Sequence, residues 1–228
     1  MRNNNKWIFV FLGVVLIAIL SYLFKTQIFK HRVNNFQNDK KLKVSASFYP
    51  LYFVSSQIGG GKSTVHNITP AGAEPHDYDP STQDIANIEK GDMLVINGGV
   101  EAWGDKIKDN LKGTNVKVVV AGNGETVKDP HAWLNPDLAR QEVEKITEEY
   151  IAIDPTNANY YKNNQSNLDK KLDELDAKYK AGLVNCQSRD IITSHAAFAY
   201  LAERYGLNQV AISGLSPDED FGAYEDDG

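Results

Sequence analysis

Cysteine is nearly absent from this sequence of 228 residues, in which Cys186 is the single example. One cysteine cannot form a disulfide within the chain, so no disulfide framework can be inferred. We expect Cys186 to be a small buried side chain, and a bridge to a cysteine in a region missing from this sequence is the alternative. With 42% hydrophobic residues, the chain is long enough to bury an apolar core instead.

Basic residues are scarce in most of the chain. Residues 1–41 hold seven of the 24 Lys and Arg residues and one of the 30 Asp and Glu residues, which leaves a net charge of −12 on residues 42–228. A body with this charge repels a polyanion, so we expect no nucleic-acid partner.

Long hydrophobic runs are limited to residues 7–24, which are apolar apart from Gly13 and Ser21. A run of about 18 residues is the short limit for a helix that crosses a membrane, and it is long for the apolar part of a cleaved signal. We expect an uncleaved transmembrane signal-anchor and a polar linker over residues 1–41, with a cleaved signal as the alternative. No cysteine follows the run closely, so a lipid anchor is not supported.

The body alternates between strand-like and helix-like segments. The predicted strands are residues 42–48, 64–69, 92–97 and 116–121. Ser81 is expected to cap a helix, and Asn135 and Pro136 are expected to begin another. Strands that alternate with helices indicate an α/β fold with a parallel sheet covered by helices on both faces.

A long amphipathic helix follows this first α/β region. Its apolar stripe predicts a length of about 40 Å, at ~1.5 Å per residue, which is longer than a crossover in a small sheet requires. We therefore expect two Rossmann-like lobes with parallel sheets: an N-terminal lobe over residues 42–155, a connecting rigid helix over 156–185 and the start of a C-terminal lobe over 186–228. After the long helix, the sequence predicts a strand over residues 190–193, a helix over 196–205 and a strand over 209–213. Two strands and one helix are too few to close a core, so we expect the second lobe to be incomplete.

Three of the five histidines occupy equivalent places in this pattern. His76, His131 and His195 each follow a predicted strand. Ligands of an open parallel sheet gather beyond the carboxyl ends of its strands, so we expect these three side chains to meet at one metal site between the lobes. Neutral imidazoles suit Zn²⁺, whereas Mn²⁺ prefers oxygen, so zinc is expected ahead of manganese. We expect His31 to be a linker residue and His66 a polar strand residue.

Acidic residues flank the three histidines. They are Glu74, Asp77, Asp79 and Asp129. Two interpretations stay open: solvated loop acids, or partners that orient an imidazole through its second nitrogen. Tyr78 and Trp133, in the same segments, are expected to be packing residues.

Four stretches carry a resemblance to a known family. They are residues 69–81 with Glu-Pro-His-Asp-Tyr, 97–103 with Asn-Gly-Gly-Val-Glu-Ala-Trp, 129–136, and 193–207 leading to 214–217. Over residues 42–218 the chain resembles the zinc/manganese-type solute-binding proteins that deliver metal to ABC importers. The resemblance implies two α/β lobes joined by a long rigid helix, and a metal bound between them by His76, His131 and His195. It also implies a fourth, acidic ligand beyond residue 228.

The resemblance further implies an extracytoplasmic, monomeric protein without enzymatic activity that passes Zn²⁺, or less readily Mn²⁺, to an ABC permease in the membrane. Two alternatives remain. A zinc hydrolase would use Glu74 or Asp77 as general base, although the sequence has no His-Glu-x-x-His motif. A surface adhesion module would use the metal only for its structure, and reversible removal of zinc without unfolding would count against it.

Overall fold

The computed structural model describes residues 19, 21–26, 40–122 and 129–218, and the chain divides into two units, Met1–Lys40 and Lys41–Gly228. In the first unit, residues 19 and 21–26 are helical. Most of the predicted signal-anchor, and His31 in the linker, lie outside the described residues. No helix within the described ranges has the length and apolar character that a membrane span needs.

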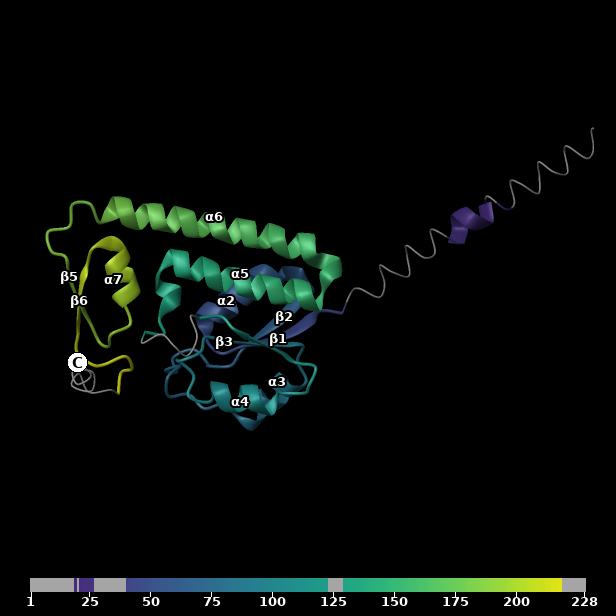
Figure 1. Cartoon of the computed structure of the whole chain (residues 1–228), viewed down its shortest axis with the longest axis horizontal. Coiled ribbons are helices and arrows are strands. Elements are labelled where there is room, and N and C mark those ends of the chain that lie inside the picture. The colour runs from purple at the N-terminus through teal and green to yellow at the C-terminus, as the bar shows by residue number, and fades with distance from the viewer. Residues whose placement is uncertain (1–18, 20, 27–39, 123–128, 219–228) are drawn as a thin grey trace, which may run out of the picture. The chain divides into compact units, whose positions relative to one another are not determined.

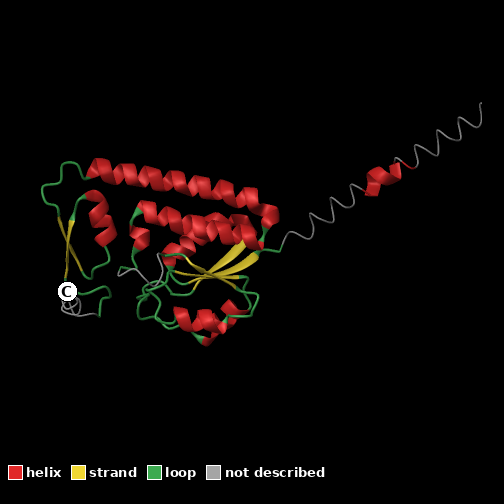
Figure 2. Ribbon diagram, in the orientation of Figure 1, coloured by secondary structure: helices red, strands yellow, loops and turns green. Residues whose placement is uncertain are grey.

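A four-stranded parallel sheet forms the centre of the second unit (Figure 2). Its strands are β1 (Leu42–Ala46), β2 (Ser63–Asn67), β3 (Met93–Ile96) and β4 (Lys117–Val120), in the order β2-β1-β3-β4. Strand β1 pairs with both β2 and β3, so that Ser45 lies opposite His66 on one side and Leu94 on the other. The four strands therefore end at one edge of the sheet, as the sequence predicts.

Helices cover both faces of this sheet. They are α2 (Tyr49–Gly59), α3 (Thr82–Glu89), α4 (Gly104–Asn110), α5 (Pro136–Ile153) and α6 (Ala158–Gly182). Helices α2, α5 and α6 lie on one side of the sheet, and α3 and α4 lie on the other (Figure 1). Each face of the sheet has its own cluster of buried apolar side chains. Successive side chains of β3 point to opposite faces, so Met93 and Val95 belong to one cluster and Leu94 and Ile96 to the other, and the whole strand is buried.

Side chains cap two of these helices as the sequence predicts. Ser81 begins α3 with a capping box, in which its hydroxyl accepts from the backbone N–H of Asp84 and the Asp84 carboxylate accepts from the N–H of Ser81. Asn135 begins α5, and its side-chain oxygen accepts from the N–H of Asp137 at 2.9 Å. Helix α4 was not predicted, because it is short and has no side-chain cap.

A second, two-stranded parallel sheet follows α6. It contains β5 (Asp190–Thr193) and β6 (Asn208–Ala211), with α7 (Ala199–Tyr205) between them in the chain. Helix α7 begins three residues later than the predicted start at Ala196, and Gly206, whose φ is 65°, caps its end after Tyr205. The α/β class with parallel sheets is confirmed, whereas the lobe boundaries remain predictions.

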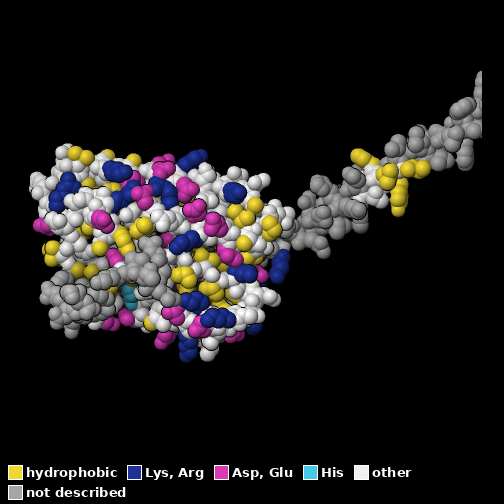
Figure 3. Space-filling model, viewed as in Figure 1, with side chains coloured by type: hydrophobic (Ala, Val, Ile, Leu, Met, Phe, Trp, Pro, Cys, Tyr) yellow, Lys and Arg dark blue, Asp and Glu magenta, His cyan; other side chains and the backbone are white. Residues whose placement is uncertain are grey.

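The prediction that Cys186 is buried is wrong. Its side chain is a free, exposed thiol. The residue lies between α6 and β5, in a segment whose residues 184–188 are all exposed. On the face shown in Figure 3, acidic and basic side chains are interspersed, so the net negative charge does not form one patch there.

Candidate metal centre

The structure brings the three predicted histidines together. His76 lies in the loop between β2 and α3, His131 follows β4 and precedes the short turn η2 (Ala132–Leu134), and His195 directly follows β5. One ligand atom from each of them lies within 4.8 Å of the others. Three loops from two sheets therefore meet at one point, which is the convergence that the strand pattern predicts.

The spacing of the imidazoles suits a single zinc ion. Atoms Nε2 of His76 and Nε2 of His131 are 3.3 Å apart. The ring of His195 has its centroid 6.0 Å from that of His76 and 5.4 Å from that of His131. Two nitrogens on a tetrahedral zinc, with Zn–N bonds of about 2.0–2.1 Å, lie roughly 3.3 Å apart, so the first pair already has this separation.

Asp129 orients the imidazole of His131. Its Oδ1 atom lies 2.7 Å from Nδ1 of His131 and accepts from the backbone N–H of the same residue at 2.9 Å. A proton held on Nδ1 by the carboxylate leaves the Nε2 lone pair for a metal. The ring is only 2% exposed and lies 5.3 Å from the ring of Trp133, which packs against Phe48 as a packing residue should.

The other three flanking acids behave differently. Asp77 and Asp79 are exposed, in agreement with the solvated interpretation. Glu74 is half-buried, and its Oε1 accepts from the backbone N–H of His76 at 3.4 Å. The negative charge of Glu74 also acts on the imidazole of His195. One carboxylate therefore influences two of the three histidines.

The loop that carries His76 is held by Asp84 of α3. Tyr78 donates its hydroxyl to Oδ2 of Asp84 at 3.2 Å, and Nε2 of His66 lies 3.0 Å from Oδ1. Burial alone would raise the pKa of Asp84, but hydrogen bonds from Ser81, His66 and Tyr78 lower it. His66 is thus a polar strand residue, as predicted, and it lies outside the histidine cluster.

The pKa values of two of the three imidazoles are lowered, which favours their neutral form. Burial lowers the pKa of His76, and the neighbouring His131 lowers it further, while Glu74 acts in the opposite direction. Burial and His131 also lower the pKa of His195. Both shifts favour the neutral imidazole, which is the form that binds a metal.

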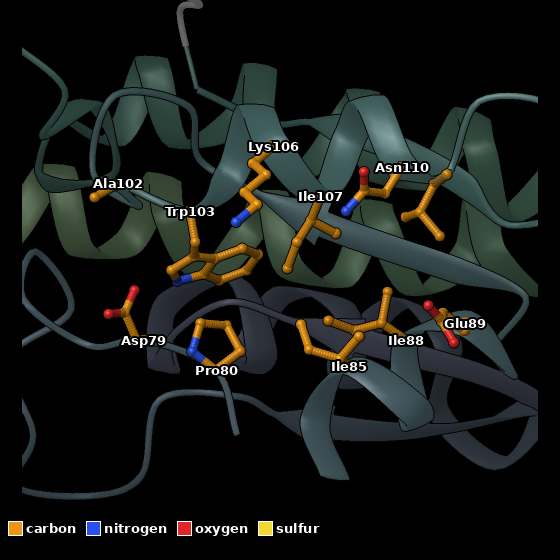
Figure 4. A pocket seen from close by; sticks show the side chains of 11 residues that line it. Asp79, Pro80, Ile85, Ile88, Glu89, Ala102, Trp103, Lys106, Ile107 and Asn110 are labelled. Carbon is orange, nitrogen blue, oxygen red and sulfur yellow. The ribbon is translucent and has the colours of Figure 1, made fainter. Parts of the chain in front are cut away.

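A separate groove of about 540 Å³ lies between α3 and α4 (Figure 4). Its walls are mainly apolar, and Trp103 faces Pro80 across it. None of the described residues that line the groove is a histidine. The groove is therefore separate from the histidine cluster.

One connection next to the cluster was not predicted. The hydroxyl of Tyr200, in α7, donates to the carbonyl of Asp129 at 3.1 Å, and the side chain of Asn135 donates to the carbonyl of Tyr200 at 3.4 Å. These bonds join α7 to the segment that carries His131. The residues are far apart in the sequence, and no local pattern marks such a pair.

Comparisons with known proteins agree with this site. A family model described as zinc-uptake complex component A, periplasmic (ZnuA), matches residues 44–225. The high-affinity zinc uptake system protein ZnuA of Bacillus subtilis is 37% identical over 202 residues, which cover 79% of this chain and 63% of that protein. The zinc-binding lipoprotein AdcA of Streptococcus pneumoniae is 37% identical over 207 residues, which cover 81% of this chain and 41% of that protein.

Solved structures show the same relationship. The crystal structure of the Zn(II)-bound ZnuA-like domain of Streptococcus pneumoniae AdcA matches with a TM-score of 0.72 and 37% identity, over 80% of this chain and 71% of that one. The present chain spans less than two thirds of the length of the two sequence relatives. The family match nevertheless extends over most of this chain, and the chain therefore belongs to the family of periplasmic component A proteins of zinc-uptake complexes.

Proposed function

We propose that this protein is the extracytoplasmic zinc-binding component of an ABC importer. It captures Zn²⁺ with His76, His131 and His195 and delivers the ion to a membrane permease, without catalysing a reaction. The observation that carries the proposal is the convergence of three imidazoles within 4.8 Å, each from a loop that follows a strand. The names of the two relatives, a zinc uptake system protein and a zinc-binding lipoprotein, support it.

The donor set favours zinc over manganese. Three nitrogen ligands suit Zn²⁺, whereas Mn²⁺ prefers more oxygen. Three histidines leave one position of a tetrahedral ion for another donor, and the family resemblance predicts an acidic residue of the second lobe there. The arrangement supports capture of an ion, because Asp129 orients His131 and the loops of His76 and His195 place a ligand atom each within 4.8 Å of it.

The architecture and location belong to the same proposal. An N-terminal lobe over residues 42–155 supplies His76 and His131, a connecting helix over 156–185 follows, and the lobe that begins at residue 186 supplies His195. The signal-anchor in residues 1–41 holds this monomer at the outer face of the cytoplasmic membrane. The description of the family as periplasmic supports an extracytoplasmic location.

Calorimetric titration of the full chain with Zn²⁺ tests the proposal. The wild-type protein should show one tight site, and His131→Ala should raise Kd by about 100-fold or more, because it removes the imidazole that Asp129 orients. His66→Ala is the matched control, since this histidine lies outside the cluster. Equal affinities of the wild type and His131→Ala, or an equal loss in His66→Ala, would refute the site.

A further inference from the structure

The turn that follows β3 contacts the segment that carries His131, although none of the three histidines of the metal centre lies in this turn. The Nδ2 atom of Asn97 donates to the carbonyl of Pro130 at 2.9 Å, directly before His131. The carbonyl of Asn97 accepts from the N–H of Gly122 at 3.0 Å. Through these two hydrogen bonds, Asn97 contacts Gly122 and Pro130, which lie between β4 and His131. Its side chain is fully buried.

The carboxylate of Glu101 holds this turn in place. Its Oε1 accepts from the N–H of Asn97 at 2.8 Å, and its Oε2 accepts from the N–H of Gly98 at 3.0 Å. Oε1 also accepts from the hydroxyl of Ser47, which follows β1. Glu101 is only 7% exposed, and hydrogen bonds to a charged acceptor are stronger than those between neutral groups. One side chain therefore joins the carboxyl ends of β1 and β3.

The turn needs such an anchor because its own residues do not determine its shape. Gly98 and Gly99 have φ angles of 83° and 87°, in the left-handed region that glycine enters freely. Consecutive glycines also have many other conformations available. The turn is tightly packed, since a Cβ on Gly98 would lie 2.7 Å from Cγ1 of Val120, and one on Gly99 would lie 3.3 Å from Cβ of Pro130.

We infer that Glu101 is a positioning residue of the metal centre: its carboxylate fixes the turn at Asn97 and Gly98, and Asn97 then fixes the backbone at Pro130 from which His131 reaches the ion. Asp129 sets the orientation of the ring, whereas Glu101 sets the position of the backbone that carries it. The inference rests on the proposed function, because it concerns the same metal site.

Glu101→Gln in the full chain tests this role. Glutamine offers one acceptor oxygen and one amide nitrogen that only donates, so either Asn97 or Gly98 loses a partner for its N–H. We expect the affinity for Co²⁺, used as a spectroscopic probe, to fall about 10-fold or more, as second-layer changes at metal sites do. The visible absorption bands of the bound Co²⁺ should also shift, because the geometry at His131 changes.

Tyr150→Phe is the matched control. The hydroxyl of Tyr150 donates to the carbonyl of Ser55 at 3.0 Å and lies 3.1 Å from the hydroxyl of Ser63, which begins β2 at the other end of the sheet. This variant also loses buried hydrogen bonds, but it leaves the ligand loops intact. Both variants should have a lower Tm, whereas only Glu101→Gln should change the Co²⁺ affinity and spectrum. Wild-type affinity and spectrum in Glu101→Gln would overturn the inference.

Two further variants follow the path of the effect. Asn97→Ala keeps the backbone N–H that Glu101 holds but removes the bond to Pro130, so it should reproduce the affinity loss. The double variant that combines Asn97→Ala with Glu101→Gln should bind Co²⁺ no more weakly than whichever single variant binds it more weakly. Additive losses of affinity would overturn the inference. Ser47→Ala removes only the hydroxyl donor and, as the milder change, should give a smaller loss of the same kind.

Hydrogen exchange of the metal-free protein separates this inference from the proposed function. The backbone N–H of His131, which donates to Asp129, should exchange faster in Glu101→Gln and at the wild-type rate in Tyr150→Phe. Unchanged exchange in Glu101→Gln would overturn the inference. If exchange depended on Glu101 but the wild-type protein bound no Co²⁺ or Zn²⁺, the proposed function would fall while the link between Glu101 and His131 remained.

Discussion

Replacing Glu142 with glutamine should stabilise the protein at neutral pH and have much less effect at acidic pH. Glu142 lies in α5 with only 2% of its surface exposed, and its Oε1 has no hydrogen-bond partner among the described residues. Burial raises the pKa of this carboxyl from 4.5 to about 8, and the charge of Glu101 adds to the effect while that of Lys145 opposes it. The native state therefore holds a proton on Glu142 that the unfolded chain releases.

The size of the effect follows from these two pKa values. Since the folded state has the higher pKa, its stabilising contribution is complete below pH 4.5 and is lost as the pH rises toward about 8. Between the two values the free energy of unfolding falls by about 1.4 kcal/mol per pH unit, or roughly 3 kcal/mol from pH 5.5 to 7.5. Glutamine does not titrate, so Glu142→Gln should lack this part of the pH dependence.

Urea unfolding at pH 5.5 and 7.5, followed by circular dichroism, measures the difference between the two proteins. Groups that titrate in both proteins cancel in this comparison. Glu144→Gln, at an exposed position of the same helix, is the control and should follow the wild-type pH dependence. If the free energy of unfolding changed equally with pH in Glu142→Gln and in the wild type, the reasoning would be refuted. A carboxyl that is neutral only in the folded state must add a pH dependence that glutamine lacks.

Three further outcomes are expected. Asp129→Asn should weaken Zn²⁺ binding by about 10–100-fold, because it alters the partner of Nδ1 on a ligand, while the exposed Asp77→Asn should not, and calorimetry distinguishes them. Arg204→Ala, which removes ion pairs from α7 to carboxylates of α5 and α6, should cost about 1.5–3 kcal/mol and speed hydrogen exchange in β5 and β6; unchanged exchange would contradict it. Gly98→Ala should cost about 1–3 kcal/mol in urea unfolding, because of its φ of 83° and the contact with Val120; wild-type stability would contradict it.

Much of the α/β body could be predicted because its signals are local. Buried parallel strands appear as apolar runs, as in β3, and the caps at Ser81 and Asn135 use hydrogen bonds between residues two or three positions apart in the chain. Loops that follow the strands of one parallel sheet lie at one edge, and His195 has the equivalent place after β5 of the second sheet. The convergence of three histidines that are far apart in the sequence could therefore be predicted without a measured interatomic distance.

Other features could not be predicted because the contacts that produce them are not local. Cys186 is exposed although its residue type alone favours burial. Helix α4 has no capping side chain to mark its start. The bond from Tyr200 to Asp129 joins helix α7 to the segment before His131, and it depends on how α7 packs.

The sequence by itself determined the alternation of strands and helices, apart from α4, and the place of His76, His131 and His195 after strands, because periodicity is a local property of the chain. Only the tertiary structure decided which acid serves which role. Asp129 bonds to an imidazole, Glu101 holds a glycine turn, and Glu142 is buried beside another carboxylate. A carboxylate takes its role from the donors, charges and solvent that surround it, and folding brings these neighbours from distant parts of the chain.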